Sequence, residues 1–242
     1  MKALEKILCS RKSLCFLDLE GTQFSHEMIA VGAVKVDIRK DGSIRKIHRG
    51  IYTLVKPKNR IGKVVTDLTG ITEEIVKKDG VPFRVAADQI KQYMGRSFTK
   101  CLFVTFGSHD QRILAQSLAH NMDVNKEDAH TLIKHAFDFA DFISTYVRDE
   151  NGNTLSLANM LKVFGLEFKG EQHNALADTY NLVYLYDAML KHRDILTVEY
   201  RKVLGKMRHL PEPVHQLILD LLSDKTVSPT DFDNLIEDSL KW

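Results

Sequence analysis

The chain has 242 residues, of which 44% are hydrophobic and 27% are charged, and its net charge at neutral pH is only +2. This is the composition of an ordinary globular protein, long enough for one large domain or a domain with an appendage. No apolar run approaches the roughly 18 residues of a membrane helix. Charged residues near the start also interrupt any signal-peptide core. The charged residues are Lys2, Glu5, Lys6, Arg11 and Lys12. We therefore expect a cytoplasmic protein.

Five apolar segments have the length and composition of β-strands. They lie at 13–20, 28–38, 47–57, 101–106 and 133–139. The first three are joined by short links, one of which carries the hairpin-turn sequence Asp-Gly-Ser at 41–43, so they predict an antiparallel meander. The last two are separated by helical sequence, which favours parallel pairing. The pattern predicts an α/β fold whose sheet is mixed.

Helical periodicity follows the meander and continues to the end of the chain. The expected helices lie at 71–78, 83–94, 110–120, 140–148, 157–164, 174–190 and 228–240. Ser156 and Gly165 are suited to begin and end the fifth of these, as N-cap and C′ glycine. A break is expected at 210–213, where the sequence is Leu-Pro-Glu-Pro. We predict a domain at residues 1–190 and a helical C-terminal extension at 191–242.

The charge of the extension changes sign along its length. Residues 191–209 carry a net charge of +4 and residues 210–242 a net charge of −5. The basic part could hold a phosphate backbone or form a solvated helix face, and the second interpretation is favoured. Its cations include Arg193, Arg201, Lys202, Lys206 and Arg208. The acidic part would repel nucleic acid, so we expect it to dock on the domain, on a protein partner or on a second copy.

Two carboxylates, Asp18 and Glu20, interrupt the first strand. Residues i and i+2 of a strand point to one face, so both side chains project together. Like charges on a buried strand are costly, and the arrangement is understandable if a divalent cation lies between them. An edge strand with its acids in water is the alternative, because Asp-x-Glu by itself is common.

Three further residues complete a candidate site. Asp110 follows an apolar strand, where open α/β sheets place ligands, although Asp is also a good N-cap for the next helix. Asp178 lies in the helix expected at 174–190 and could equally be solvated. His173 precedes that helix, with Asn174 as a plausible N-cap. The histidine would therefore belong to the loop and need not share a helix face with Asp178.

These side chains together suit one chemistry. Two metal ions held by three or four carboxylates clamp the attacking and leaving oxygens of a phosphoryl displacement. A histidine with an ordinary pKa takes up a proton near neutral pH. His109, beside Asp110, is expected to be incidental or adjacent to substrate, because neighbouring residues at a strand end point apart.

The blocks "FLDLEGT", "FGSHD" and "HNALAD" resemble, in order and spacing, those of the DEDDh 3′→5′ exonucleases, an RNase H-like family that includes ribonuclease T and the polymerase proofreading subunit. "SHEMIAVGAV", "TDLTGIT" and "TLSLANMLKVFGL" also look like family segments, and the resemblance covers about residues 12–190. It implies an RNase H-like mixed five-stranded sheet flanked by helices, and two Mg²⁺ or Mn²⁺ ions. The metal ligands would be Asp18, Glu20, Asp110 and Asp178.

The resemblance also assigns roles around the metal ions. Asp18 would bridge both ions and His173 would be the catalytic general base. Thr22 and Phe24 would lie where the family grips and wedges the 3′-terminal nucleotide. The first block has Gly21 after the Glu, where many members have Thr, and the second lacks the usual upstream Asn. Its "FGSHD" form is similar to that of the histone-mRNA exonuclease and its bacterial relatives, which favours RNA as substrate.

The sequence thus predicts a metal-dependent 3′→5′ exonuclease that hydrolyses single-stranded nucleic acid, RNA more than DNA, to 5′-mononucleotides. Two alternatives remain. One is a binding or regulatory module with a silent nuclease site, against which the intact set of five site residues argues. The other is a proofreading subunit held to a polymerase by its extension, against which the form of the second block argues.

Overall fold

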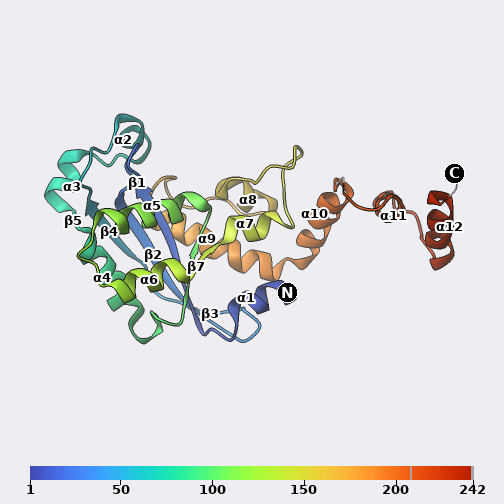
Figure 1. Cartoon of the computed structure of the whole chain (residues 1–242), viewed down its shortest axis with the longest axis horizontal. Coiled ribbons are helices and arrows are strands. Elements are labelled where there is room, and N and C mark those ends of the chain that lie inside the picture. Colours follow the sequence, from blue (N-terminus) through green and yellow to red (C-terminus); the bar gives the residue numbers. More distant parts are fainter. Residues whose placement is uncertain (208, 241–242) are drawn as a thin grey trace.

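The structure, a computed structural model, describes residues 1–207 and 209–240, and Arg208 of the basic stretch lies outside them. A seven-stranded sheet in the order β5-β4-β2-β1-β6-β7, with β3 paired to β2, forms the centre (Figure 1). β1 is antiparallel to β2 and parallel to β6. The strands are β1 (Ser13–Gly21), β2 (Met28–Ile38), β3 (Ile44–Ile47), β4 (Ile51–Lys56), β5 (Val81–Pro82), β6 (Leu102–Thr105) and β7 (Ala136–Asp138).

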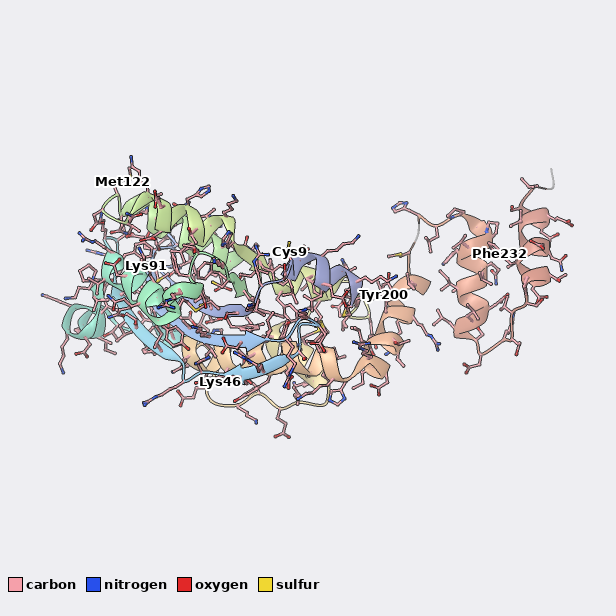
Figure 2. All side chains as sticks on the ribbon, turned by 90° about the horizontal axis from the view of Figure 1, so that it is seen from below. Cys9, Lys46, Lys91, Met122, Tyr200 and Phe232 are labelled. Atoms are coloured by element: carbon pink, nitrogen blue, oxygen red, sulfur yellow. The ribbon has the colours of Figure 1, made fainter. Side chains whose placement is uncertain are left out.

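Helices cover both faces of this sheet. Figure 2 shows α9 on one side of the strands and α4 to α6 on the other. The helices of the main body are α1 (Lys2–Leu8), α2 (Lys63–Thr69), α3 (Glu73–Asp79), α4 (Phe83–Met94), α5 (Ser108–His120), α6 (Lys126–Lys134), α7 (Phe139–Ser144), α8 (Leu157–Val163) and α9 (Ala175–Lys191), with a 3₁₀ turn at Gly95–Ser97.

The mixed α/β sheet predicted from the sequence is confirmed, with two differences in detail. The segment expected as a strand at 47–57 forms β4, whereas β3 just before it and the two-residue edge strand β5 were not predicted. Three helices, α1, α2 and α6, were not predicted. Ser156 caps α8 as expected, by accepting a hydrogen bond from the backbone of Asn159.

β1 divides two hydrophobic cores, and its alternating side chains decide which residue faces which core. Leu14 and Phe16 pack with side chains of α9, such as Leu182. Leu17 packs on the opposite face, where α4 and α5 supply residues such as Ile113. The even-numbered side chains of β1 therefore point toward α9. Because the period of a strand is two residues, Asp18 and Glu20 continue on that same face.

α9 approaches the sheet closely at one glycine. Gly32 of β2 pairs with Asp18 of β1, and a Cβ atom on Gly32 would overlap the backbone of Ala175, the first residue of α9. The absence of a side chain at Gly32 lets the start of α9 contact the sheet beside Asp18. The first turn of α9 is thereby placed next to the two carboxylates of β1.

Three helices continue beyond α9: α10 (Arg193–Gly205), α11 (Glu212–Leu222) and α12 (Pro229–Ser239). α10 touches the main body, since the Tyr200 ring lies 5.0 Å from that of Tyr146 and the Lys206 Nζ donates to the Glu150 carbonyl at 2.9 Å. No described residue of α11 or α12 is buried. Both project away from the sheet (Figures 1 and 2).

The expected break in the extension is displaced by a few residues. α10 ends at Gly205 and α11 starts at Glu212, so Pro213 does not lie in the break but in the first turn of α11. Proline is tolerated there because its missing N–H has no helical partner at that position. The division of the chain near residue 190 stays a prediction. No helix in the described part of the chain is long and apolar enough to cross a membrane, and cytoplasmic location also stays a prediction.

Candidate active site

Three carboxylates meet where β1 approaches its end. Asp18 and Glu20 project from β1 and Asp178 from the first turn of α9, and one ligand atom of each lies within 4.8 Å of the others. All three are partly buried. Asp18 and Glu20 share one face of β1, as predicted. β1 is a central strand, with β2 on one side and β6 on the other. The alternative of an edge strand with its acids in water is therefore wrong.

The loop before α9 places His173 beside Asp178. Asn174 is the N-cap, as predicted, because its side-chain oxygen accepts a hydrogen bond from the Ala177 amide at 3.1 Å. His173 has a φ of 63°, a left-handed conformation that turns the chain before the helix begins. The histidine is exposed, and the pKa of Asp178 is raised by burial and lowered by His173. The loop histidine thus acts electrostatically on the helix carboxylate, although they lie on different elements.

Asp110 lies next to the carboxylate cluster but in a distinct setting. It occupies the first turn of α5, is buried, and accepts a hydrogen bond from the Leu19 amide of β1 at 3.0 Å. The N-cap of α5 is Gly107, so the interpretation of Asp110 as a helix cap is wrong. Its carboxylate is not one of the three that lie within 4.8 Å of one another in the described residues. Among the charges around Asp18, that of Asp110 has the largest effect on the Asp18 pKa.

Burial and mutual repulsion make these acids hard to ionise. The pKa of Asp18 is well above its usual value because the group is buried and faces Asp110, Asp178 and Glu20. Burial and the charges of Asp178 and Asp110 raise the pKa of Glu20 to about 8. Burial raises the pKa of Asp178 to about 6, against the lowering effect of His173.

The donor set fits a hard divalent cation. In the described residues, no Lys or Arg forms an ion pair with Asp18, Glu20 or Asp178. Carboxylate oxygens are the ligands that Mg²⁺ and Mn²⁺ prefer. A cation would neutralise the repulsion that the protein alone leaves uncompensated, so the cluster is suited to bind divalent metal.

The two residues expected to contact substrate differ in exposure. Thr22 is 1% exposed, and its hydroxyl lies 2.7 Å from that of Ser25 and accepts from the Glu27 amide. The Thr22 side chain therefore holds the turn after β1. Phe24, at the tip of the same turn, is 80% exposed. A contact of either residue with nucleic acid stays a prediction, and the exposed ring favours Phe24.

Several residues near the site were missed in the sequence. Gly32 had a signal, because an isolated glycine within a strand often marks a close backbone approach. Glu27, which accepts hydrogen bonds from Ser25 and from the Lys58 amide, had none. Tyr52 on β4 also gave no signal, although its pKa is raised by burial and by the charge of Glu20.

Among the contacts that the structure describes, His109 makes none that would suit a general base. Its ring lies edge-on to that of His26, with centroids 5.4 Å apart. Burial and the nearby Arg112 lower the pKa of both histidines. The pair lies between the turn after β1 and the start of α5, in keeping with an incidental or substrate-adjacent place.

Comparisons with known proteins identify the family of the chain. A protein-family model described as Exonuclease matches residues 15–186. The relative ERI1 exoribonuclease 2 of Xenopus laevis is 25% identical in a match that is 224 residues long and covers 84% of this chain and 30% of the relative. The chain thus spans less than a third of that relative's length.

Two solved structures show the same fold. The nuclease domain of 3′hExo, a DEDDh family member bound to rAMP, has a TM-score of 0.61 and 20% identity, over 75% of this chain and 93% of that one. Escherichia coli exonuclease I in a complex with single-stranded DNA has a TM-score of 0.60 and 17% identity, over 84% of this chain and 46% of that one. The family match extends over most of the chain, and its range includes the five predicted site residues. The chain therefore belongs to the exonuclease family, and its fold is that of the DEDDh-family structure above.

Proposed function

We propose that this protein is a metal-dependent 3′→5′ exonuclease that hydrolyses single-stranded nucleic acid to 5′-mononucleotides, with RNA favoured over DNA. The observation that carries the proposal is the cluster of Asp18, Glu20 and Asp178 within 4.8 Å, uncompensated by cations of the described chain. Asp110 is proposed as the fourth ligand, because it is buried beside β1 and its charge acts on Asp18. Two Mg²⁺ or Mn²⁺ ions are proposed, with Asp18 between them.

The bound ions would supply the electrostatic clamp on the attacking and leaving oxygens of the displacement. The chain itself would provide ligands and a proton acceptor. His173 is exposed beside Asp178, so its imidazole would take a proton from the attacking water. Water adds to phosphorus, the bond from phosphorus to the 3′-oxygen breaks, and the departing oxygen takes up a proton to become the new 3′-hydroxyl.

RNA is favoured by the form of the second sequence block, "FGSHD", and by the names of two relatives. One is an exoribonuclease, and another solved relative, of 19% identity, recognises the 3′ end of a histone mRNA stem-loop. Exonuclease I, bound to single-stranded DNA, shares the fold equally well. The exposed Phe24 ring would stack on a base of either nucleic acid, since every base has a π-face.

The test is degradation of 5′-end-labelled single-stranded RNA and DNA of one sequence, with Mg²⁺, with Mn²⁺ and with EDTA. We expect metal-dependent shortening from the 3′ end, faster on RNA. Blocking the 3′-hydroxyl separates exonuclease from endonuclease cleavage. If no metal shortens either substrate, the proposal fails and the silent binding module becomes the better interpretation.

We also propose that residues 191–242 mediate self-association or bind a protein partner. The support is α11, whose large apolar side chains are partly exposed, with Leu221 51% exposed. The mass in solution of the wild-type protein and of Leu221→Lys, measured across protein concentrations, tests self-association. A monomeric wild type would exclude it and leave a partner protein.

A further inference from the structure

A second charged region lies at the opposite end of the sheet from the carboxylates. A cavity of about 560 Å³ opens between the link from α1 to β1, the turn after the 3₁₀ segment, and the junction of α6 with β7. Ser13 at the start of β1 and Cys101 before β6 line it. Figure 1 shows α1 at the far end of the sheet from α2, and Cys9, which lines the cavity, is labelled in Figure 2.

The charge of this cavity has one sign. Four permanent cations line it, and no Asp or Glu is among its described lining residues. The cations are Arg11, Lys12, Arg96 and Lys100. None of them has a carboxylate within ion-pair distance in the described chain. Four hydroxyl side chains share the lining. Like charges brought together without counter-ions repel one another, so the cavity is suited to an anion.

Two side chains of this lining have a buried polar atom without a hydrogen bond in the described chain. They are Arg11, at its Nε, and His135, at its Nδ1. The Arg11 Nη1 donates to the carbonyls of Ile7 and Leu8, which fixes the guanidinium at the end of α1. Because Arg11 lines the cavity, its fixed guanidinium would hold a bound anion in one position. Burial lowers the pKa of His135, and the charges of Arg11 and Lys134 lower it further.

One acid that contacts a residue of this lining is already paired. Asp37 accepts a hydrogen bond from Ser13 at 3.0 Å, and it also bonds to Arg45 and His48. It does not line the cavity and leaves the four cations uncompensated. The lining also holds no aromatic ring of Phe, Tyr or Trp that would stack on a nucleobase. Cations with hydroxyl donors and no stacking surface are suited to a phosphate group.

We propose that this pocket binds a phosphate group, either a phosphodiester of a nucleic-acid strand or a free phosphate monoester. The first source rests on the proposed function and sets a length requirement. Asp18 lies five positions after Ser13 along β1, which is about 17 Å at the rise of a strand. At the spacing of about 3.4 Å per nucleotide of a stacked strand, a strand with its 3′ end at the carboxylates would need about five nucleotides to reach the pocket.

Binding is tested on the whole chain in EDTA, so that catalysis plays no part. The ligands are inorganic phosphate, a 5′-mononucleotide, and single-stranded oligonucleotides of three and fifteen nucleotides. The pocket variant is Arg96→Ala/Lys100→Ala, because both side chains are exposed and their loss leaves the core intact. The matched control is Lys126→Ala/Lys162→Ala, which removes the same charge from exposed positions outside the pocket. Thermal unfolding verifies that both variants fold.

The pocket variant is expected to bind at least one phosphate ligand about tenfold more weakly than the control. If the pocket binds a phosphate of a nucleic-acid strand, only the fifteen-nucleotide ligand binds the pocket variant more weakly than the control. The slope of log K against log salt for that ligand then decreases in magnitude by about 0.7 per lost contact. For a free phosphate, inorganic phosphate and the mononucleotide lose affinity. Equal affinities of pocket and control variants for all four ligands would overturn the proposal, whatever the nuclease assay shows.

Discussion

The two ends of β1 carry opposite charges, and neither end is neutralised by the described chain. Near the end of the strand, Asp18 and Glu20 face Asp178 with no cation paired to them. At its start, Arg11 and Lys12 border a cavity without a carboxylate. Both arrangements are costly in an isolated protein, so each is suited to an ion of opposite sign. One end is suited to divalent metal and the other to phosphate.

The largest expected effect is at the acidic end. Asp18→Asn removes one charge from the cluster and should lower exonuclease activity by about 10³–10⁴-fold, because metal ions supply several kcal/mol of transition-state stabilisation. Single-turnover rates at saturating Mg²⁺ measure it. Asp123→Asn, at an exposed position outside the cluster, is the control and should keep full activity. Equal rates for both variants would separate Asp18 from the chemistry.

His173→Ala should have the next largest effect, a loss of about 10²–10⁴-fold, which is the contribution of a general base. Substrate affinity in EDTA should change little. Added imidazole should restore part of the rate, which a purely structural role would not allow. His209→Ala, in the extension, serves as control. Full activity of His173→Ala would assign the proton transfer elsewhere.

Gly32→Ala tests whether the acidic end depends on the close approach of α9. The new methyl would overlap the Ala175 backbone. The free energy of unfolding should therefore fall by about 1–3 kcal/mol, as it does for an overpacked core. Activity should fall with it, because Asp178 moves with α9. The control is Gly165→Ala, because Gly165 has a φ of 69° and no atom lies near its Cβ position. This change should lower the free energy of unfolding by about 1–2 kcal/mol through backbone strain alone. The activity of this variant should persist.

The smallest expected effect is a pH dependence of stability in EDTA. The folded-state pKa of Glu20 is about 8, raised from 4.5, so between these values the folded protein holds a proton that the unfolded chain has lost. The stability contributed below pH 4.5 is therefore lost as the pH rises through 8. Compared with Glu20→Gln, the wild type should lose Tm over this range, and Mg²⁺ should restore it. Parallel curves of Tm against pH would contradict the raised pKa.

Much of the acidic end could be predicted from the sequence, because its signals are local. Asp18 and Glu20 are two positions apart on one strand, which fixes their shared face. Asn174 is a good N-cap, which fixes where α9 begins and leaves His173 in the loop. The setting of Asp110 was not predictable in this way. Its bond to the Leu19 amide joins residues 91 positions apart, and only the packing of α5 against β1 determines it.

The sequence by itself determined the mixed sheet, the order of its main elements, and the five residues that resemble a DEDDh site. Tertiary structure decided which faces meet. It placed the start of α9 against Gly32 and directed the Thr22 hydroxyl to Ser25 within the turn after β1. It also left Phe24 exposed. It also gathered Arg11, Arg96 and His135, from segments far apart in the chain, around one cavity. Periodicity reports local conformation, whereas contacts between distant segments arise only when the chain packs.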